Sequence, residues 1–178
     1  MTTIRFYPLV AGIVLTLWGT GIAVAQSPAS SSGFIDNFDD WSAFSEKENG
    51  KPLCYMASLP KKSEGGYAQR GDTYVMVTHR PAEKTVGEVS VRAGYSYKEG
   101  SEVEVRIDSN QPFKLFTDQG FAWTRDAKTD QAIVTSLKAG STLIVVGMSG
   151  RGTLTTDTYS LKGFTAAYEA ISKACGVK

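Results

Sequence analysis

Three side chains of this sequence have the types that a serine hydrolase needs: Ser149 as nucleophile, His79 as base and Asp157 as orienting acid. The stretch GMSGRG around Ser149 argues against this chemistry. Arg151 stands where the G-x-S-x-G elbow requires glycine, and the spacing of phosphate-binding loops is missing too. The sequence SGRG between two β-type runs instead favours a four-residue hairpin turn. We therefore predict no enzyme activity, with a serine hydrolase as the alternative.

Three arginines, Arg70, Arg80 and Arg151, could form a site for an anion or for the acidic patch of a partner. A guanidinium fork matches the oxygens of carboxylates and phosphates, which supports this possibility. The interpretation that we favour is that each arginine pairs with a nearby acid, and Asp157 is the expected partner of Arg151. His79, at the end of a predicted strand beside Arg80, is expected to be exposed and is a further candidate for partner binding.

Most aromatic residues should pack in the core or across strands, because large rings supply much of the buried area of a β-sandwich. Tyr67 and Trp123 differ because they stand beside glycines or polar loops. Exposed aromatic side chains often anchor protein partners. We therefore treat Tyr67 and Trp123 as candidates for partner binding.

Two cysteines, Cys54 and Cys175, are most simply joined as one disulfide if the chain is exported. A redox-active pair is the alternative, but the C-x-x-C arrangement is missing. With a single histidine and two cysteines engaged in a disulfide, a histidine-rich zinc site is excluded and a thiolate site is disfavoured. We predict no metal and no cofactor.

The first 25 residues have the order of a secretory signal peptide: one charge at Arg5, an apolar stretch, and a small-x-small ending at Ala23-Val24-Ala25. Cleavage is predicted before Gln26, with an uncleaved membrane anchor as the alternative. Residues 26–33, QSPASSSG, are small and polar and predict a flexible leader. Residues 34–178 then form a single predicted domain. We expect no membrane span after cleavage.

Removing 25 residues from the 178 leaves 153, which suits one domain with a sizeable core. Without Arg5 the chain has 18 basic and 18 acidic residues and is formally neutral. Proteins that bind nucleic acid rely on a concentrated positive field, so this balance argues against such a partner.

Short runs rich in β-branched and aromatic residues recur about every ten positions, separated by turn residues. They predict strands over 40–46, 53–59, 73–79, 86–93, 102–107, 112–117, 141–147 and 154–161. Helices are predicted over about 130–139, with Thr129 as N-cap, and about 164–175, where an apolar stripe includes Cys175. The expected fold is mainly β, an antiparallel β-sandwich or barrel-like domain with two helices.

An ordered set of motifs across residues 40–175 closely resembles the invasion-associated locus B family of exported Gram-negative, mainly alphaproteobacterial, proteins. The motifs are LCYMASLPKKSEG, RGDTYVMVTHRP, EVS followed by AGY, EGSEVEVRID, FKLFTDQGFAW, AGSTLIVVGMS and RGTLTTDTYSLKGF with a final AC. The resemblance supplies no catalytic residues. The framework that it carries over comprises Cys54, Cys175, Thr78-His79-Arg80-Pro81, Trp123, Arg151-Gly152-Thr153 and Asp157-Thr158-Tyr159-Ser160-Leu161.

The resemblance implies an extracytoplasmic β domain, named for a locus needed when some pathogens enter host cells. We therefore expect a binding protein in the periplasm or at the extracellular or outer-membrane surface, with a protein or cell-envelope partner and a possible contribution to virulence. A purely structural envelope protein is the remaining alternative.

Overall fold

The computed structural model describes residues 33–67 and 69–178, so the predicted signal peptide and most of the predicted leader lie outside the described residues. The described part contains eleven strands and two α-helices, with a short 3-10 helix at Pro81–Glu83. The elements are β1 (Phe34–Phe38), β2 (Trp41–Glu48), β3 (Lys51–Ser58), β4 (Lys62–Gly65), β5 (Thr73–Arg80), β6 (Thr85–Ala93), β7 (Glu102–Ile107), β8 (Phe113–Asp118), β9 (Phe121–Trp123), α1 (Ala127–Ala139), β10 (Thr142–Met148), β11 (Leu154–Ser160) and α2 (Phe164–Cys175).

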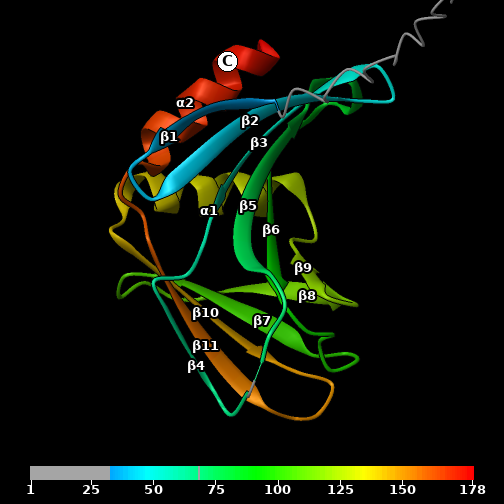
Figure 1. The fold of residues 1–178 in the computed structure, drawn as a ribbon, viewed down its shortest axis with the longest axis vertical. Coiled ribbons are helices and arrows are strands. Elements are labelled where there is room, and N and C mark those ends of the chain that lie inside the picture. The colour runs from blue at the N-terminus through cyan, green and yellow to red at the C-terminus, as the bar shows by residue number, and fades with distance from the viewer. Residues whose placement is uncertain (1–32, 68) are drawn as a thin grey trace, which may run out of the picture. The chain divides into compact units, whose positions relative to one another are not determined.

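The strands form one antiparallel sheet in the order β1-β2-β3-β5-β6-β9-β8-β7-β10-β11-β4. Figure 1 shows β1, β2 and β3 in the upper half and β7, β10, β11 and β4 in the lower half, with β5 and β6 running between them. The edge strands β1 and β4 do not pair with each other in the described part, so the sheet is not closed into a barrel. The predicted mainly-β, sandwich-like antiparallel fold is confirmed.

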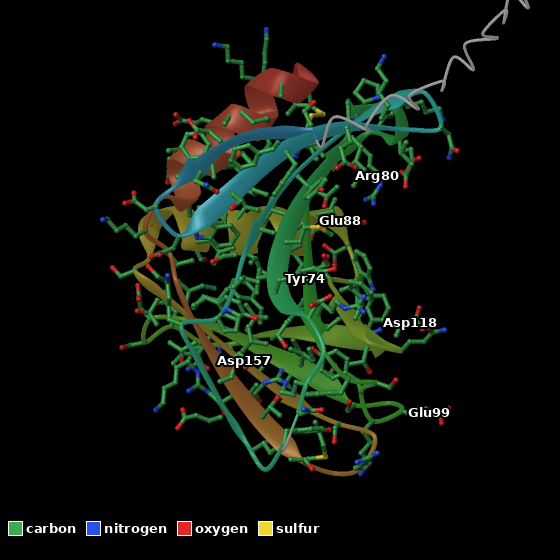
Figure 2. The ribbon with its side chains drawn as sticks, in the orientation of Figure 1. Tyr74, Arg80, Glu88, Glu99, Asp118 and Asp157 are labelled. Carbon is green, nitrogen blue, oxygen red and sulfur yellow. A yellow bond between two sulfur atoms is a disulfide. The ribbon has the colours of Figure 1, made fainter. Side chains whose placement is uncertain are left out.

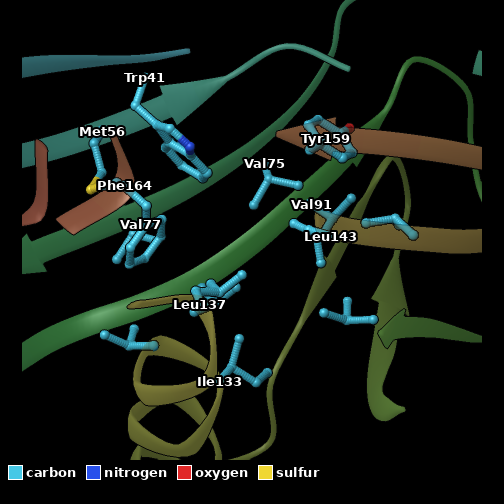
Figure 3. Close-up of a cluster of buried hydrophobic side chains, with 14 of the residues drawn as sticks. Trp41, Met56, Val75, Val77, Val91, Ile133, Leu137, Leu143, Tyr159 and Phe164 are labelled. Carbon is cyan, nitrogen blue, oxygen red and sulfur yellow. The ribbon is translucent and has the colours of Figure 1, made fainter. Parts of the chain in front are cut away.

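Alternating apolar residues direct one face of the sheet into the core. In β7, Val103, Val105 and Ile107 are buried, whereas Glu102 and Arg106, on the opposite face, are exposed. Figure 3 shows how the core joins the two halves of the sheet, since valines of β5 and β6 lie between the Trp41, Met56 and Phe164 side chains on one side and Leu143 and Tyr159 on the other.

Helix α1 begins three residues before the predicted start and packs on β6. Its N-cap is Asp126, whose carboxylate accepts a hydrogen bond from the Thr129 backbone N–H at 2.8 Å, so the prediction of Thr129 as N-cap was wrong. An aspartate in extended conformation satisfies a free amide of the first turn, and the helix starts directly after it. Ile133, Val134 and Leu137 face the core, as predicted.

Helix α2 matches the predicted span and packs on β2, β3 and β5. Its last residue, Cys175, forms a disulfide with Cys54 of β3, and their Cα atoms are 5.9 Å apart. The predicted disulfide is confirmed, and it joins the C-terminal helix to an early strand. The indole N–H of Trp41 adds a hydrogen bond to the Ser160 carbonyl at 3.1 Å, just ahead of this helix.

Candidate functional site

His79 is buried under α2, so the expectation that it would be exposed was wrong. It continues the inward alternation of Val75 and Val77 along β5, which explains its orientation. Its Nδ1 accepts a hydrogen bond from the Gly87 backbone N–H at 2.9 Å, so Nε2 carries the proton and donates it to Ser172 Oγ at 3.1 Å. Burial lowers the pKa of His79 from 6.5 to about 4. A neutral imidazole with both nitrogens engaged is not available as a catalytic base.

Ser149 serves the turn in which it lies. Its buried hydroxyl accepts hydrogen bonds from the backbone N–H groups of Arg151 and Thr153, at 3.3 and 3.2 Å. Asp157 pairs with an arginine and not with His79. Each of the three residues considered as a triad therefore belongs to a separate network, and the hydrolase constellation does not assemble.

Arg80 lies apart from the other two candidate arginines. Its guanidinium contacts Glu48 at 3.3 Å and Glu88 at 2.6 Å. Figure 2 shows Arg80 and Glu88 in the upper half of the domain and Asp157 in the lower half. The structure therefore does not form the three-arginine cluster, and Arg80 follows the favoured alternative of pairing with nearby acids.

Asp157 pairs with Arg70, so the predicted ion pair between Arg151 and Asp157 was wrong. The Arg70 fork donates to both carboxylate oxygens of Asp157 at 2.7 Å, across 87 residues of sequence. Its Nε and Nη2 also donate to the Ala93 carbonyl, at 3.0 and 2.7 Å. Asp157 alternates inward on β11 with Thr155 and Tyr159, whereas Arg151 lies in the exposed turn before that strand.

The Arg70–Asp157 pair is a charged contact almost removed from water, with side-chain exposures of 12% and 3%. Burial by itself would lower the pKa of Arg70, but the hydrogen bonds and charge of Asp157 outweigh it and raise that pKa. Burial raises the pKa of Tyr97 and Tyr159 nearby, so both phenols stay neutral. Arg70 is therefore the positive charge that compensates Asp157.

Tyrosine rings cover this ion pair. The rings of Tyr67 and Tyr95 stack with centroids 5.2 Å apart and an interplanar angle of 6°, and Arg70 Cζ lies 5.1 Å from the Tyr95 centroid. The Tyr95 hydroxyl shares a hydrogen bond of 2.7 Å with Thr155. Tyr97 packs edge-on against Tyr95, with ring centroids 5.3 Å apart. The buried Arg70–Asp157 salt bridge thus supports the surface that the Tyr67 and Tyr95 rings form.

Above this surface lies a pocket with a volume of about 870 Å³, which we name the tyrosine–arginine pocket. Tyr67, Tyr95, Gln69 and Arg151 contribute to its lining, and Gly66, Gly94 and Gly150 bring backbone to its wall. The Gly150 backbone N–H donates a hydrogen bond to the Ser96 carbonyl at 2.9 Å, which links the two chain segments that line the pocket. Arg151 is exposed and has no acidic partner within 4 Å in residues 33–67 and 69–178. The pocket therefore offers aromatic rings beside a guanidinium fork open to solvent.

The sequence-based candidates divide between this pocket and other places. Tyr67 and Arg151 line the pocket, and Arg70 supports it through Tyr95. Trp123 does not line the pocket, because it lies on β9, where it stacks on Phe121 with centroids 5.6 Å apart. Sequence reasoning missed Gln69 and the role of Tyr95. The available signal was the Gly94-Tyr95-Ser96-Tyr97 run, in which a glycine is followed by two aromatic residues at alternating positions.

Among the described residues, no three His, Cys, Asp or Glu side chains are grouped so that they could hold a metal ion. No helix in this part of the chain has the length and apolar character needed to cross a membrane.

The described residues form a disulfide-linked β domain with a surface recess, in which Ser149, His79 and Asp157 do not contact one another. Residues 41–172 match the family described as invasion associated locus B (IalB) protein, which is well over half of the chain, so the chain belongs to that family. The family is not a known enzyme family.

A solved structure has a similar fold. The crystal structure of invasion associated protein B from Bartonella henselae aligns with a TM-score of 0.54 at 16% sequence identity, covering 78% of this chain and 94% of the other. Comparison with curated proteins gives no match.

Proposed function

We propose that this IalB family member is an exported binding protein that holds its partner in the tyrosine–arginine pocket and performs no catalysis. The observation that carries the proposal is the exposed Arg151 beside a recess of about 870 Å³ lined by Tyr67 and Tyr95. Recessed sites with a few fixed polar groups are the usual form of ligand sites in proteins. The buried Arg70–Asp157 pair holds Tyr95 before a ligand arrives, which reduces the ordering cost of binding.

The proposed location is the periplasm or the outer surface of the cell, after cleavage before Gln26. The signal-peptide pattern and the Cys54–Cys175 disulfide support export, because disulfides persist in oxidising compartments. The test is mass spectrometry of the protein recovered from a periplasmic or culture fraction. A mature N-terminus at Gln26 supports the proposal, and an intact N-terminus in the membrane fraction contradicts it.

The proposed partner belongs to the cell envelope or to a host cell. The printed name of the Bartonella protein associates that protein with invasion, and family membership extends an invasion role to this chain as a proposal. A purely structural envelope protein would not need an open pocket with a free guanidinium. The pocket therefore favours binding over that alternative.

Photocrosslinking inside cells tests the binding site. A photoreactive benzophenone amino acid at Gln69, which is exposed and lines the pocket, should give a defined adduct. The same amino acid at Gln131, which is exposed on α1, is the matched control and should give none. Equal labelling from both positions, or none from Gln69, would contradict the proposal.

A further inference from the structure

A second recess adjoins the tyrosine–arginine pocket. It has a volume of about 330 Å³, and Gly94, Tyr95 and Ser96 line both recesses. The second recess adds Arg92, Gln119 and Phe121 to the lining. Gly94–Ser96 borders both recesses, and we name the two together the double groove. Its extent suits an elongated ligand better than a single small molecule.

The double groove has an arginine in each recess and no carboxylate in its lining. Arg151 lines one recess, and Arg92 lines the other, where its Cζ lies 5.1 Å from the Phe121 ring centroid. In the described part of the chain neither arginine lies within 4 Å of an acidic side chain. Asp72 and Asp118 adjoin lining residues in sequence but line neither recess. Two uncompensated guanidinium groups favour a ligand with at least two separate acidic groups.

The remaining lining indicates the chemical class of that ligand. It consists of aromatic rings, amide and hydroxyl side chains and glycine backbone, and in neither recess does a described Val, Leu, Ile or Met side chain contribute. Grooves that dock peptides use apolar pockets or a free strand edge. Rings that stack on C–H faces, beside amides and hydroxyls that bind hydroxyl groups, suit a sugar chain.

We propose that the double groove binds a linear anionic glycan, with Tyr67 against a sugar face and with Arg151 and Arg92 each binding an acidic group on a different sugar residue. This inference rests on the proposed function and names the class of its ligand. The acidic groups are carboxylates or sulfates, since both accept two hydrogen bonds from one guanidinium.

Calorimetric titration of the purified mature protein tests the class of ligand. The probes are tetragalacturonate, a chondroitin sulfate tetrasaccharide, neutral cellotetraose and the peptide tetraglutamate. Binding of either acidic tetrasaccharide, at least about tenfold tighter than cellotetraose and tetraglutamate, supports the proposal, and the stronger of the two identifies carboxylate or sulfate as the acidic group. Tighter binding of tetraglutamate, equal binding of cellotetraose or no binding of either acidic glycan overturns it.

Substitutions locate the binding to the double groove. Arg151→Gln and Arg92→Gln should each weaken glycan binding about tenfold, the usual range for loss of one charge-assisted contact. The matched control is Arg125→Gln, because Arg125 also lies over an aromatic ring, at 5.5 Å from the Phe116 centroid, and lines neither recess. Unchanged affinity in the first two variants, or an equal loss in the control, overturns the proposal. Arg151 lies in an exposed turn, so its variant should fold even if Arg92→Gln does not.

The two proposals fail differently. A Gln69-specific adduct in cells together with no glycan binding overturns the ligand class and leaves the pocket as a binding site. Absence of both the adduct and glycan binding overturns both proposals.

Discussion

The two halves of the domain each bury an ionisable side chain and treat it differently. Under α2, His79 is neutral and both ring nitrogens have partners, while the Cys54–Cys175 bond closes that half covalently. In the other half, Asp157 pairs with Arg70, and an open pocket lies above the pair. Burial of a titratable group therefore does not by itself mark a site, and the binding that we propose lies in the half with an exposed guanidinium beside a recess.

We expect substitutions in the two halves to affect different properties, stability in one and ligand binding in the other. The helix-covered half should lose stability when it is altered, with the pocket intact. The pocket half contains one residue that should affect stability, Asp157, and one that should affect binding alone, Arg151. Four predictions test this division.

Removal of the disulfide should have the largest effect. The double variant Cys54→Ala, Cys175→Ala opens a loop spanning a sequence separation of 121, and loop-closure entropy assigns such a bond roughly 4 to 5 kcal/mol of the free energy of unfolding. Urea denaturation measures the loss, and reduction of the wild-type protein should reproduce it. The Gln69 crosslink should persist below the new melting temperature. A loss under about 1 kcal/mol would show that the helix-covered half does not depend on its covalent link.

Asp157→Asn should destabilise the fold by about 4 kcal/mol, because it leaves the Arg70 charge buried without a counterion. The control is Asp118→Asn, an exposed acid whose replacement should change the free energy of unfolding by less than about 0.5 kcal/mol. Replacing both partners, as Arg70→Met with Asp157→Leu, should recover much of the loss. If the double variant is as unstable as Asp157→Asn, the unpaired charge is not the cause.

The His79 pKa predicts loss of stability at mildly acidic pH. The unfolded imidazole takes up a proton below about pH 6.5, whereas the folded one does so only near pH 4, so protons favour the unfolded state between these values. The free energy of unfolding should fall by about 2 kcal/mol between pH 7.5 and pH 5. Urea denaturation at both values measures this, and His79→Gln should show a correspondingly smaller pH dependence. An identical pH dependence in the variant would contradict the assignment to His79.

Arg151→Gln should have the smallest effect on stability, under about 0.5 kcal/mol, because the side chain is exposed in a turn. The same variant should weaken the Gln69 crosslink. Urea denaturation of the purified variant measures the stability, and photocrosslinking inside cells measures the binding. A variant that unfolds like wild type and crosslinks with equal yield would remove Arg151 from the site.

Sequence reasoning was sufficient for much of the fold because the responsible signals are local. The alternation of Val103, Val105 and Ile107 and the apolar stripe of α2 are visible within one element. Strands β1, β4 and β9 were missed because they have three to five residues, and β4, with the sequence KSEG, is exposed throughout. Such strands are defined by the neighbour with which they pair, here β11 for β4.

The contacts of the candidate site were harder to predict than the strands and helices, because they join residues that are far apart in the sequence. Arg70 and Asp157 are 87 residues apart, and the nearer Arg151 was the wrong partner because it lies in the turn and not on the inward face of β11. The orientation of His79 could have been predicted, since it follows Val75 and Val77 at two-residue intervals. Its expected exposure gave too much weight to the end of the strand and too little to the alternation along it.

The position of the disulfide also has a consequence for the order of events during synthesis. Cys54 is synthesised 121 residues before its partner Cys175. The disulfide can therefore form only after nearly the whole domain has been synthesised. With two cysteines in the chain, the only wrong partner is a cysteine of another molecule. Formation of the disulfide is therefore a late step in folding. A high local concentration of incomplete chains would favour intermolecular disulfides through Cys54 instead.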